Sequence, residues 1–115
     1  MSKPEHDRTI DYIEFGATDI EATKRFYAAS FGWKFTDYGP DYVAFEDGRL
    51  TGGFTTESKP GGAPLVVLYA AKLEETFATV KAQRGRIVRE IFSFPGGRRF
   101  HFVDPNGNEL AVWGA

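Results

Sequence analysis

Residues 10–17 alternate in a way that predicts a β-strand with two different faces. Ile13 and Phe15 fall on one face, and Tyr12 and Glu14 fall on the other. A carboxylate in the middle of such a strand needs a hydrogen-bond partner or water, because a buried charge without one is costly. The face that carries Glu14 is therefore unusual for a core, and the carboxylate has either a partner or a solvated position.

The first half of the chain predicts a strand, a helix and three further strands. Asp19 is a natural N-cap, apolar residues recur at helical spacing after it, and Gly32 ends the pattern. Short β-prone runs separated by turn residues follow at 33–36, 42–46 and 50–55.

A connector rich in Pro and Gly at residues 59–64 divides the chain nearly in half. The same order of elements is expected after it. We expect a strand at 65–70, a helix at 73–84, strands at 86–91, 99–103 and 109–113, and a loop at 92–97 that would suit a lid or a simple turn.

The two halves also share individual residues at a constant offset of 53 positions. The matched pairs are Ile20 with Leu73, Glu21 with Glu74, Thr23 with Thr76, and Gly32 with Gly85. This predicts an α+β fold built from two βαβββ repeats, at about 10–57 and 64–115, within a single domain spanning residues 1–115.

Three segments resemble the vicinal oxygen chelate superfamily, which includes glyoxalases, bleomycin resistance proteins and extradiol dioxygenases. The segments are DIEATKRFY at 19–27, FGWKF at 31–35 and DPNGN at 104–108. The resemblance covers nearly the whole chain. It implies that each repeat curls into a half-barrel of mixed β-sheet with its helix packed outside. It also implies that two units enclose a small-molecule cavity, usually with a divalent metal.

By this resemblance, four strand positions supply the metal ligands, typically two His or His-like residues and two Glu. In this sequence those positions fall on Tyr12, on Gly52 or Gly53, on Leu65 and on Ala111. Tyrosine is a poor substitute for histidine, and the other residues carry no donor atom. We therefore expect no metal and no other cofactor.

His101 is the second polar candidate, because it alternates with Phe100 and Phe102, which are expected on the packed face. The resemblance turns the His101 side of the strand toward the cavity, with a simple rim histidine as the alternative. We expect Glu14 and His101 to be the catalytic or anchoring groups of one cavity whose ligand-binding walls are Tyr12, Tyr69 and Trp113.

The composition of the 115-residue chain disfavours some classes of binding partner. A formal net charge of −2 offers no basic surface for nucleic acid, and no apolar run is long enough to span a membrane. The chain has no cysteine, so stability must come from packing. We expect a cytoplasmic protein whose partners are a small-molecule ligand and a second copy of the chain, because members of the family pair their units across a homodimer.

Three functions follow from the resemblance. The favoured one is a glyoxalase-like small-molecule binding protein or enzyme with an aromatic cavity and without the usual metal site. A metal-dependent lyase, isomerase or dioxygenase would need a relocated site made from Glu14, His101 and Glu109. A drug-sequestering resistance protein would bind a cationic compound in an acidic groove, for which the charge gives little support.

Overall fold

The computed structural model describes residues 4–115 and contains two compact units. The first unit comprises residues 12–65. The second unit comprises residues 66–115 together with the N-terminal segment through Asp11. No described helix has both the length and the apolar character needed to cross a membrane.

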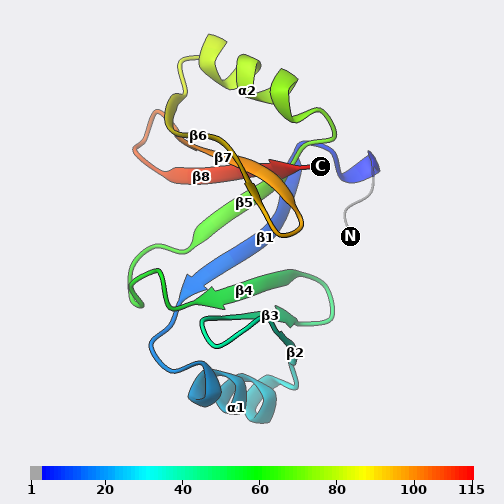
Figure 1. The fold of residues 1–115 in the computed structure, drawn as a ribbon, viewed down its shortest axis with the longest axis vertical. Helices are drawn as coiled ribbons and strands as arrows, with labels where there is room; N and C mark the ends of the chain where they lie inside the picture. Colours follow the sequence, from blue (N-terminus) through cyan, green and yellow to red (C-terminus); the bar gives the residue numbers. More distant parts are fainter. Residues whose placement is uncertain (1–3) are drawn as a thin grey trace. The chain divides into compact units, whose positions relative to one another are not determined.

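The first unit is built on a βαβββ repeat (Figure 1). Its elements are β1 (Thr9–Gly16), whose first residues are assigned to the second unit, α1 (Ile20–Phe31), β2 (Lys34–Asp37), β3 (Tyr42–Glu46) and β4 (Thr51–Thr55). The strands lie in the order β2-β3-β4-β1, in which β1 and β4 are parallel and the other pairs are antiparallel.

Helix α1 is delimited by the residues that the sequence indicated, and it covers one face of this sheet. The Asp19 carboxylate accepts a hydrogen bond of 2.9 Å from the Ala22 amide, and Gly32 ends the helix in a left-handed conformation with φ of 73°. The core beneath the helix is strongly aromatic, since the Trp33 ring stacks on both Tyr27 and Phe45. Its buried members are Ala17, Ile20, Val43, Phe45 and Phe54, with Phe15 packed against them.

The second unit repeats the same architecture. Its elements are the short 3₁₀ helix η1 (Pro4–His6), β5 (Leu65–Tyr69), α2 (Leu73–Ala82), β6 (Arg86–Phe94), β7 (Gly97–Val103) and β8 (Glu109–Gly114). Their order is β6-β7-β8-β5, with β5 parallel to β8 and the other pairs antiparallel. The expected pair of βαβββ repeats with mixed sheets is thereby confirmed.

Helix α2 covers one face of the second sheet, as Figure 1 shows. Phe77 of the helix meets Phe100 of β7 edge to face, with ring centroids 5.0 Å apart. Leu73, Ala70 and Val112 complete the buried cluster. Because side chains alternate along a strand, His101 and Trp113 lie on the face away from α2, as the alternation predicted.

The expected loop at 92–97 is wrong, because β6 continues through Phe94 and β7 begins at Gly97. Residues 92–94 pair with 97–99, so only Pro95 and Gly96 are left to form the turn. Gly96 has a φ of 131°, a conformation that glycine adopts at little cost, which makes this tight reversal possible. Phe92 and Phe94 are half-buried strand residues rather than exposed aromatic residues of a lid.

Candidate functional site

A chain of hydrogen bonds links three half-buried side chains on the face of the first sheet away from α1. The Tyr42 hydroxyl donates to Glu14 Oε2 over 2.8 Å. It lies 2.6 Å from the Tyr12 hydroxyl, which donates to it because the Tyr42 proton is already used. The carboxylate that the sequence singled out is therefore held from β3.

Gly53 of β4 makes this arrangement possible. Glu14 and Ala44 both pair with Gly53, so that β4 separates the strands of Glu14 and Tyr42. A Cβ atom on Gly53 would stand 2.0 Å from the Tyr42 hydroxyl oxygen and 2.7 Å from that of Tyr12. The tyrosine hydroxyl groups thus occupy the space that a side chain at this position would need.

The electrostatics of this cluster keep Tyr42 protonated. Burial raises the pKa of the Tyr42 hydroxyl far above its ordinary range, and the nearby Glu14 carboxylate raises it further. Tyr42 is therefore a fixed hydrogen-bond donor, and a ligand proton in this unit would be accepted by the Glu14 carboxylate.

In the second unit, His101 is almost fully buried, with 5% of its surface exposed. Its Nδ1 lies 2.9 Å from Oε2 of Glu109, the first residue of β8 after the β7–β8 turn. A carboxylate only accepts hydrogen bonds, so Nδ1 carries the proton and Nε2 carries a lone pair. Nε2 is buried and has no hydrogen-bond partner among the described residues.

Burial lowers the pKa of His101 below its ordinary value of 6.5. The hydrogen bond that Nδ1 donates to Glu109 raises the pKa, while the positive charges of Arg99 and Arg89 lower it further. The imidazole is therefore neutral at neutral pH, and Nε2 can accept a hydrogen bond or a proton from a ligand.

Two β-bulges in β6 bring additional side chains to the His101 face. Ile87 pairs with Phe102 and Arg89 pairs with His101, so β6 has one extra residue between Ile87 and Arg89. Phe92 pairs with Arg99, so β6 has a second extra residue between Arg89 and Phe92. Paired residues of antiparallel strands share a face. Arg89 and Phe92 therefore lie on the same side as His101.

The aromatic residues expected to line the site meet one another within the second unit. The rings of Tyr69 and Trp113 are 5.1 Å apart, and the indole Nε1 of Trp113 donates a hydrogen bond of 3.0 Å to Asp11. Phe94 lies at the edge of Trp113, with ring centroids 6.5 Å apart. These rings form an apolar surface beside the strand that carries His101.

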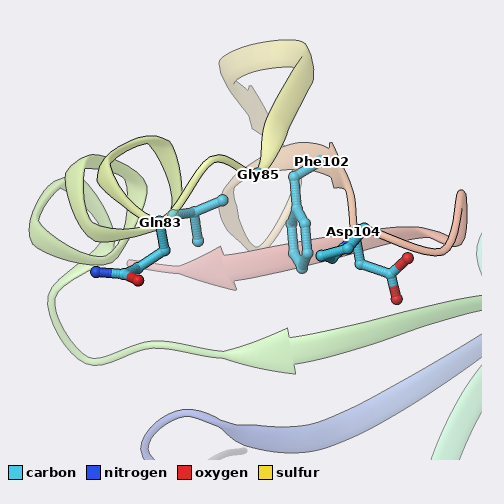
Figure 2. Close-up of a pocket in the computed structure, with 6 residues that line it drawn as sticks. Gln83, Gly85, Phe102 and Asp104 are labelled. Carbon is cyan, nitrogen blue, oxygen red and sulfur yellow. The ribbon is translucent and has the colours of Figure 1, made fainter.

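Two pockets in the described residues lie away from these side chains. One, of about 330 Å³, is an open hollow at the exposed β3–β4 turn, lined by Asp47, Arg49 and Leu50. The other, of about 190 Å³, lies between the end of α2 and the turn before β8. Figure 2 shows the Phe102 ring standing in this pocket between Gln83 and Asp104.

The second pocket has little capacity for chemistry. Its Asp104 carboxylate already accepts hydrogen bonds from the amides of Asn106 and Asn108. Its volume is also below the roughly 300 Å³ at which small-molecule sites usually begin. It is a shallow surface hollow at the helix end rather than the site of interest.

A family model described as the Glyoxalase/Bleomycin resistance protein/Dioxygenase superfamily matches residues 9–112. The chain belongs to this superfamily. No curated protein matches the sequence significantly.

Solved structures of superfamily members share the fold at low sequence identity. The Mn(II)-bound glyoxalase from Novosphingobium aromaticivorans is 22% identical with a TM-score of 0.67, and the match covers 91% of this chain but 38% of that one. A superfamily member from Vibrio splendidus 12B01 is 16% identical with a TM-score of 0.69, covering 90% and 97% of the two chains. Methylmalonyl-CoA epimerase from Mycobacterium tuberculosis is 10% identical with a TM-score of 0.70, covering 99% and 92%.

The residues present do not fit the divalent metal that the superfamily usually binds. Leu65 and Ala111 offer no donor atom, and the space above Gly53 is taken by the Tyr42 hydroxyl. Within residues 4–115, no three His, Cys, Asp or Glu side chains are grouped as metal ligands.

The structure brings the predicted site residues together in two sets, Tyr12 with Glu14 in the first unit and Tyr69 with Trp113 in the second, which also holds His101. Whether both sets face one cavity stays a prediction. Sequence reasoning missed Tyr42, Arg89 and Phe92. The Glu14 carboxylate inside a strand indicated that some residue must donate a hydrogen bond to it. The sequence did not indicate that this residue is Tyr42, because that depends on the order of the strands in the sheet.

Proposed function

We propose that this chain is a small-molecule binding protein or enzyme of the glyoxalase superfamily that acts without the usual metal. One observation carries the proposal. On the face of each sheet away from its helix, a carboxylate or an imidazole is held by a hydrogen bond, to Tyr42 for Glu14 and to Glu109 for His101. Groups oriented in this way are suited to anchor a ligand or to accept its proton.

The surrounding residues support binding of an organic ligand rather than an inorganic ion. Tyr12 in the first unit, and Tyr69 with Trp113 in the second, provide flat apolar surfaces with polar tips, which is the usual lining of a small-molecule site. Glu14 serves as the polar anchor in the first unit and His101 in the second, without a cofactor. We propose further that the functional form is a homodimer, in which pairing of units completes the binding sites.

A thermal shift screen of small organic acids, aldehydes and their conjugates tests this proposal. A ligand that binds the folded state raises the melting temperature in proportion to its concentration and affinity. For a ligand found in this way, Glu14→Gln and His101→Asn should each weaken binding by about 5- to 150-fold, the loss expected from one buried hydrogen bond.

Two matched variants separate a local loss of binding from a general effect of substitution. Glu46→Gln changes an exposed carboxylate on β3, and His6→Asn changes an exposed histidine in η1, so both should bind like the unaltered chain. The proposal fails if no compound raises the melting temperature at millimolar concentration, or if all four variants bind equally well.

A further inference from the structure

Three side chains with different chemistry lie on one face of β6 and β7 in the second unit. The Arg89 guanidinium carbon lies 3.9 Å from the centre of the Phe92 ring. The Phe92 ring lies 5.8 Å from the imidazole of His101. A cation, an apolar ring and a hydrogen-bond acceptor are thus adjacent, and the two β6 bulges are what bring them to the same side.

The buried nitrogen of His101 points to a ligand with a donor group. Glu109 fixes the proton on Nδ1, which leaves Nε2 as an acceptor that no described residue satisfies. Buried polar atoms in folded proteins nearly always have a partner, so an unsatisfied one calls for an explanation. A hydroxyl group of a bound molecule would supply the missing hydrogen bond.

The Arg89 side chain points to a ligand with a carboxylate. It is exposed and forms no ion pair within the part of the chain that the structure describes. An exposed guanidinium group beside a ring offers paired N–H groups, which match the two oxygens of a carboxylate. Arg99, whose guanidinium lies 5.6 Å from the same ring, adds a second positive charge nearby.

We propose that this face of the second unit binds a small aromatic carboxylate that also carries a hydroxyl group. The carboxylate lies on Arg89, the aromatic body on Phe92, and the hydroxyl donates to Nε2 of His101. This inference rests on the proposed small-molecule function and names its ligand class. Because Nε2 is buried, a ligand forms this hydrogen bond only after displacing the atoms that cover it.

Calorimetric titration of the full chain with three probes tests the ligand class. The probe 3-hydroxybenzoate has both required groups, benzoate lacks the hydroxyl, and 3-hydroxybenzamide lacks the negative charge. We expect 3-hydroxybenzoate to bind about tenfold more tightly than benzoate and at least tenfold more tightly than 3-hydroxybenzamide, the loss expected when one hydrogen bond is absent. Binding of the amide as tight as that of the acid would overturn the inference.

Variants assign the contacts. Arg89→Gln should weaken 3-hydroxybenzoate by about 10- to 100-fold, because a charged hydrogen-bond donor is lost. The matched control Arg84→Gln removes an exposed arginine from the turn after α2 and should leave affinity unchanged. His101→Asn should remove the preference for 3-hydroxybenzoate over benzoate while benzoate affinity stays the same. Equal losses in Arg89→Gln and Arg84→Gln would contradict the assignment.

A direct readout in the unaltered chain avoids any dependence on whether His101→Asn folds. The ¹⁵N resonance of His101 Nε2 should shift on addition of 3-hydroxybenzoate and should not shift on addition of benzoate. An unchanged resonance at saturation, or no binding of 3-hydroxybenzoate at millimolar concentration, overturns this inference. In that case the proposed function still stands if another compound from the thermal shift screen binds and is weakened by Glu14→Gln.

Discussion

The Tyr42 hydroxyl donates a hydrogen bond to Glu14 across an intervening strand, from β3 over Gly53 of β4 to β1. A tyrosine two strands away thus contacts the carboxylate across a position that has no side chain. In the second unit, by contrast, Glu109 and His101 lie on the two strands of one hairpin. In both cases a polar group that sequence patterning singled out takes part in a hydrogen bond on the face away from the helix.

Removing the Tyr42 hydroxyl should destabilise the chain. Tyr42→Phe leaves the Tyr12 hydroxyl and the Glu14 carboxylate without this shared partner, and we expect the free energy of unfolding to fall by about 1 to 3 kcal/mol. Urea denaturation measures the change. Tyr38→Phe is the matched control, because Tyr38 is 64% exposed and should tolerate the same deletion. Equal stability of the two variants would contradict the role given to Tyr42.

A methyl group at position 53 should disrupt the same hydrogen-bond chain. In Gly53→Ala the new Cβ would stand 2.0 Å from the Tyr42 hydroxyl oxygen, so the tyrosine must move and lose its hydrogen bonds. We expect a loss of about 1 to 3 kcal/mol in unfolding free energy. In Gly62→Ala the nearest atom would be 3.7 Å away, and the melting temperature should stay close to that of the parent. A similar small effect at both glycines would argue against the crowding at Gly53.

The buried imidazole predicts a loss of stability in mild acid. The pKa of His101 in the folded state lies below the ordinary 6.5, so as pH falls below about 6.5 the unfolded chain binds more protons than the folded chain. The free energy of unfolding should therefore decrease from about pH 7 to pH 5. His101→Asn should flatten this slope, whereas His6→Asn should keep it. A slope that is the same in both variants would assign the acid sensitivity to other groups.

Divalent metals should have no effect on stability. By the resemblance, the four metal-ligand positions hold Tyr12, Gly52 or Gly53, Leu65 and Ala111, and of these residues only the tyrosine has a side-chain donor atom. We expect elemental analysis of the purified chain to find no stoichiometric transition metal, and EDTA to leave the melting temperature unchanged. A drop of several degrees with EDTA that Mn²⁺ or Zn²⁺ reverses would refute this.

The chain should be a dimer in solution. Members of the superfamily that it resembles pair their units across chains, and homodimers with twofold symmetry are the commonest oligomers. Light scattering at micromolar concentration should give about twice the chain mass of 12.8 kDa. A mass equal to one chain across the concentration range would rule this prediction out.

The sequence predicted those parts of the fold that depend on neighbouring residues, such as helix caps and the alternation of side chains along a strand. Asp19 and Gly32 delimit α1, and alternation placed Phe15 and Phe100 in the cores and His101 on the opposite face. The β6 bulges were not predictable, because an inserted residue leaves no mark in a short polar and apolar pattern. Residues 92–97 were expected to form a loop because of their Pro and Gly residues, whereas the turn uses only Pro95 and Gly96. The partner of Glu14 was missed because it comes from a strand that is adjacent neither in sequence nor in the sheet.

The β6 bulges decide which side chain of the strand stands opposite His101. In an unbroken ladder continuing from the pair of Ile87 and Phe102, Val88 would stand opposite His101, whereas the inserted residue places Arg89 there instead. The chemical environment of the imidazole in this unit therefore depends on an irregularity in the backbone pairing as much as on the amino acids of the strand.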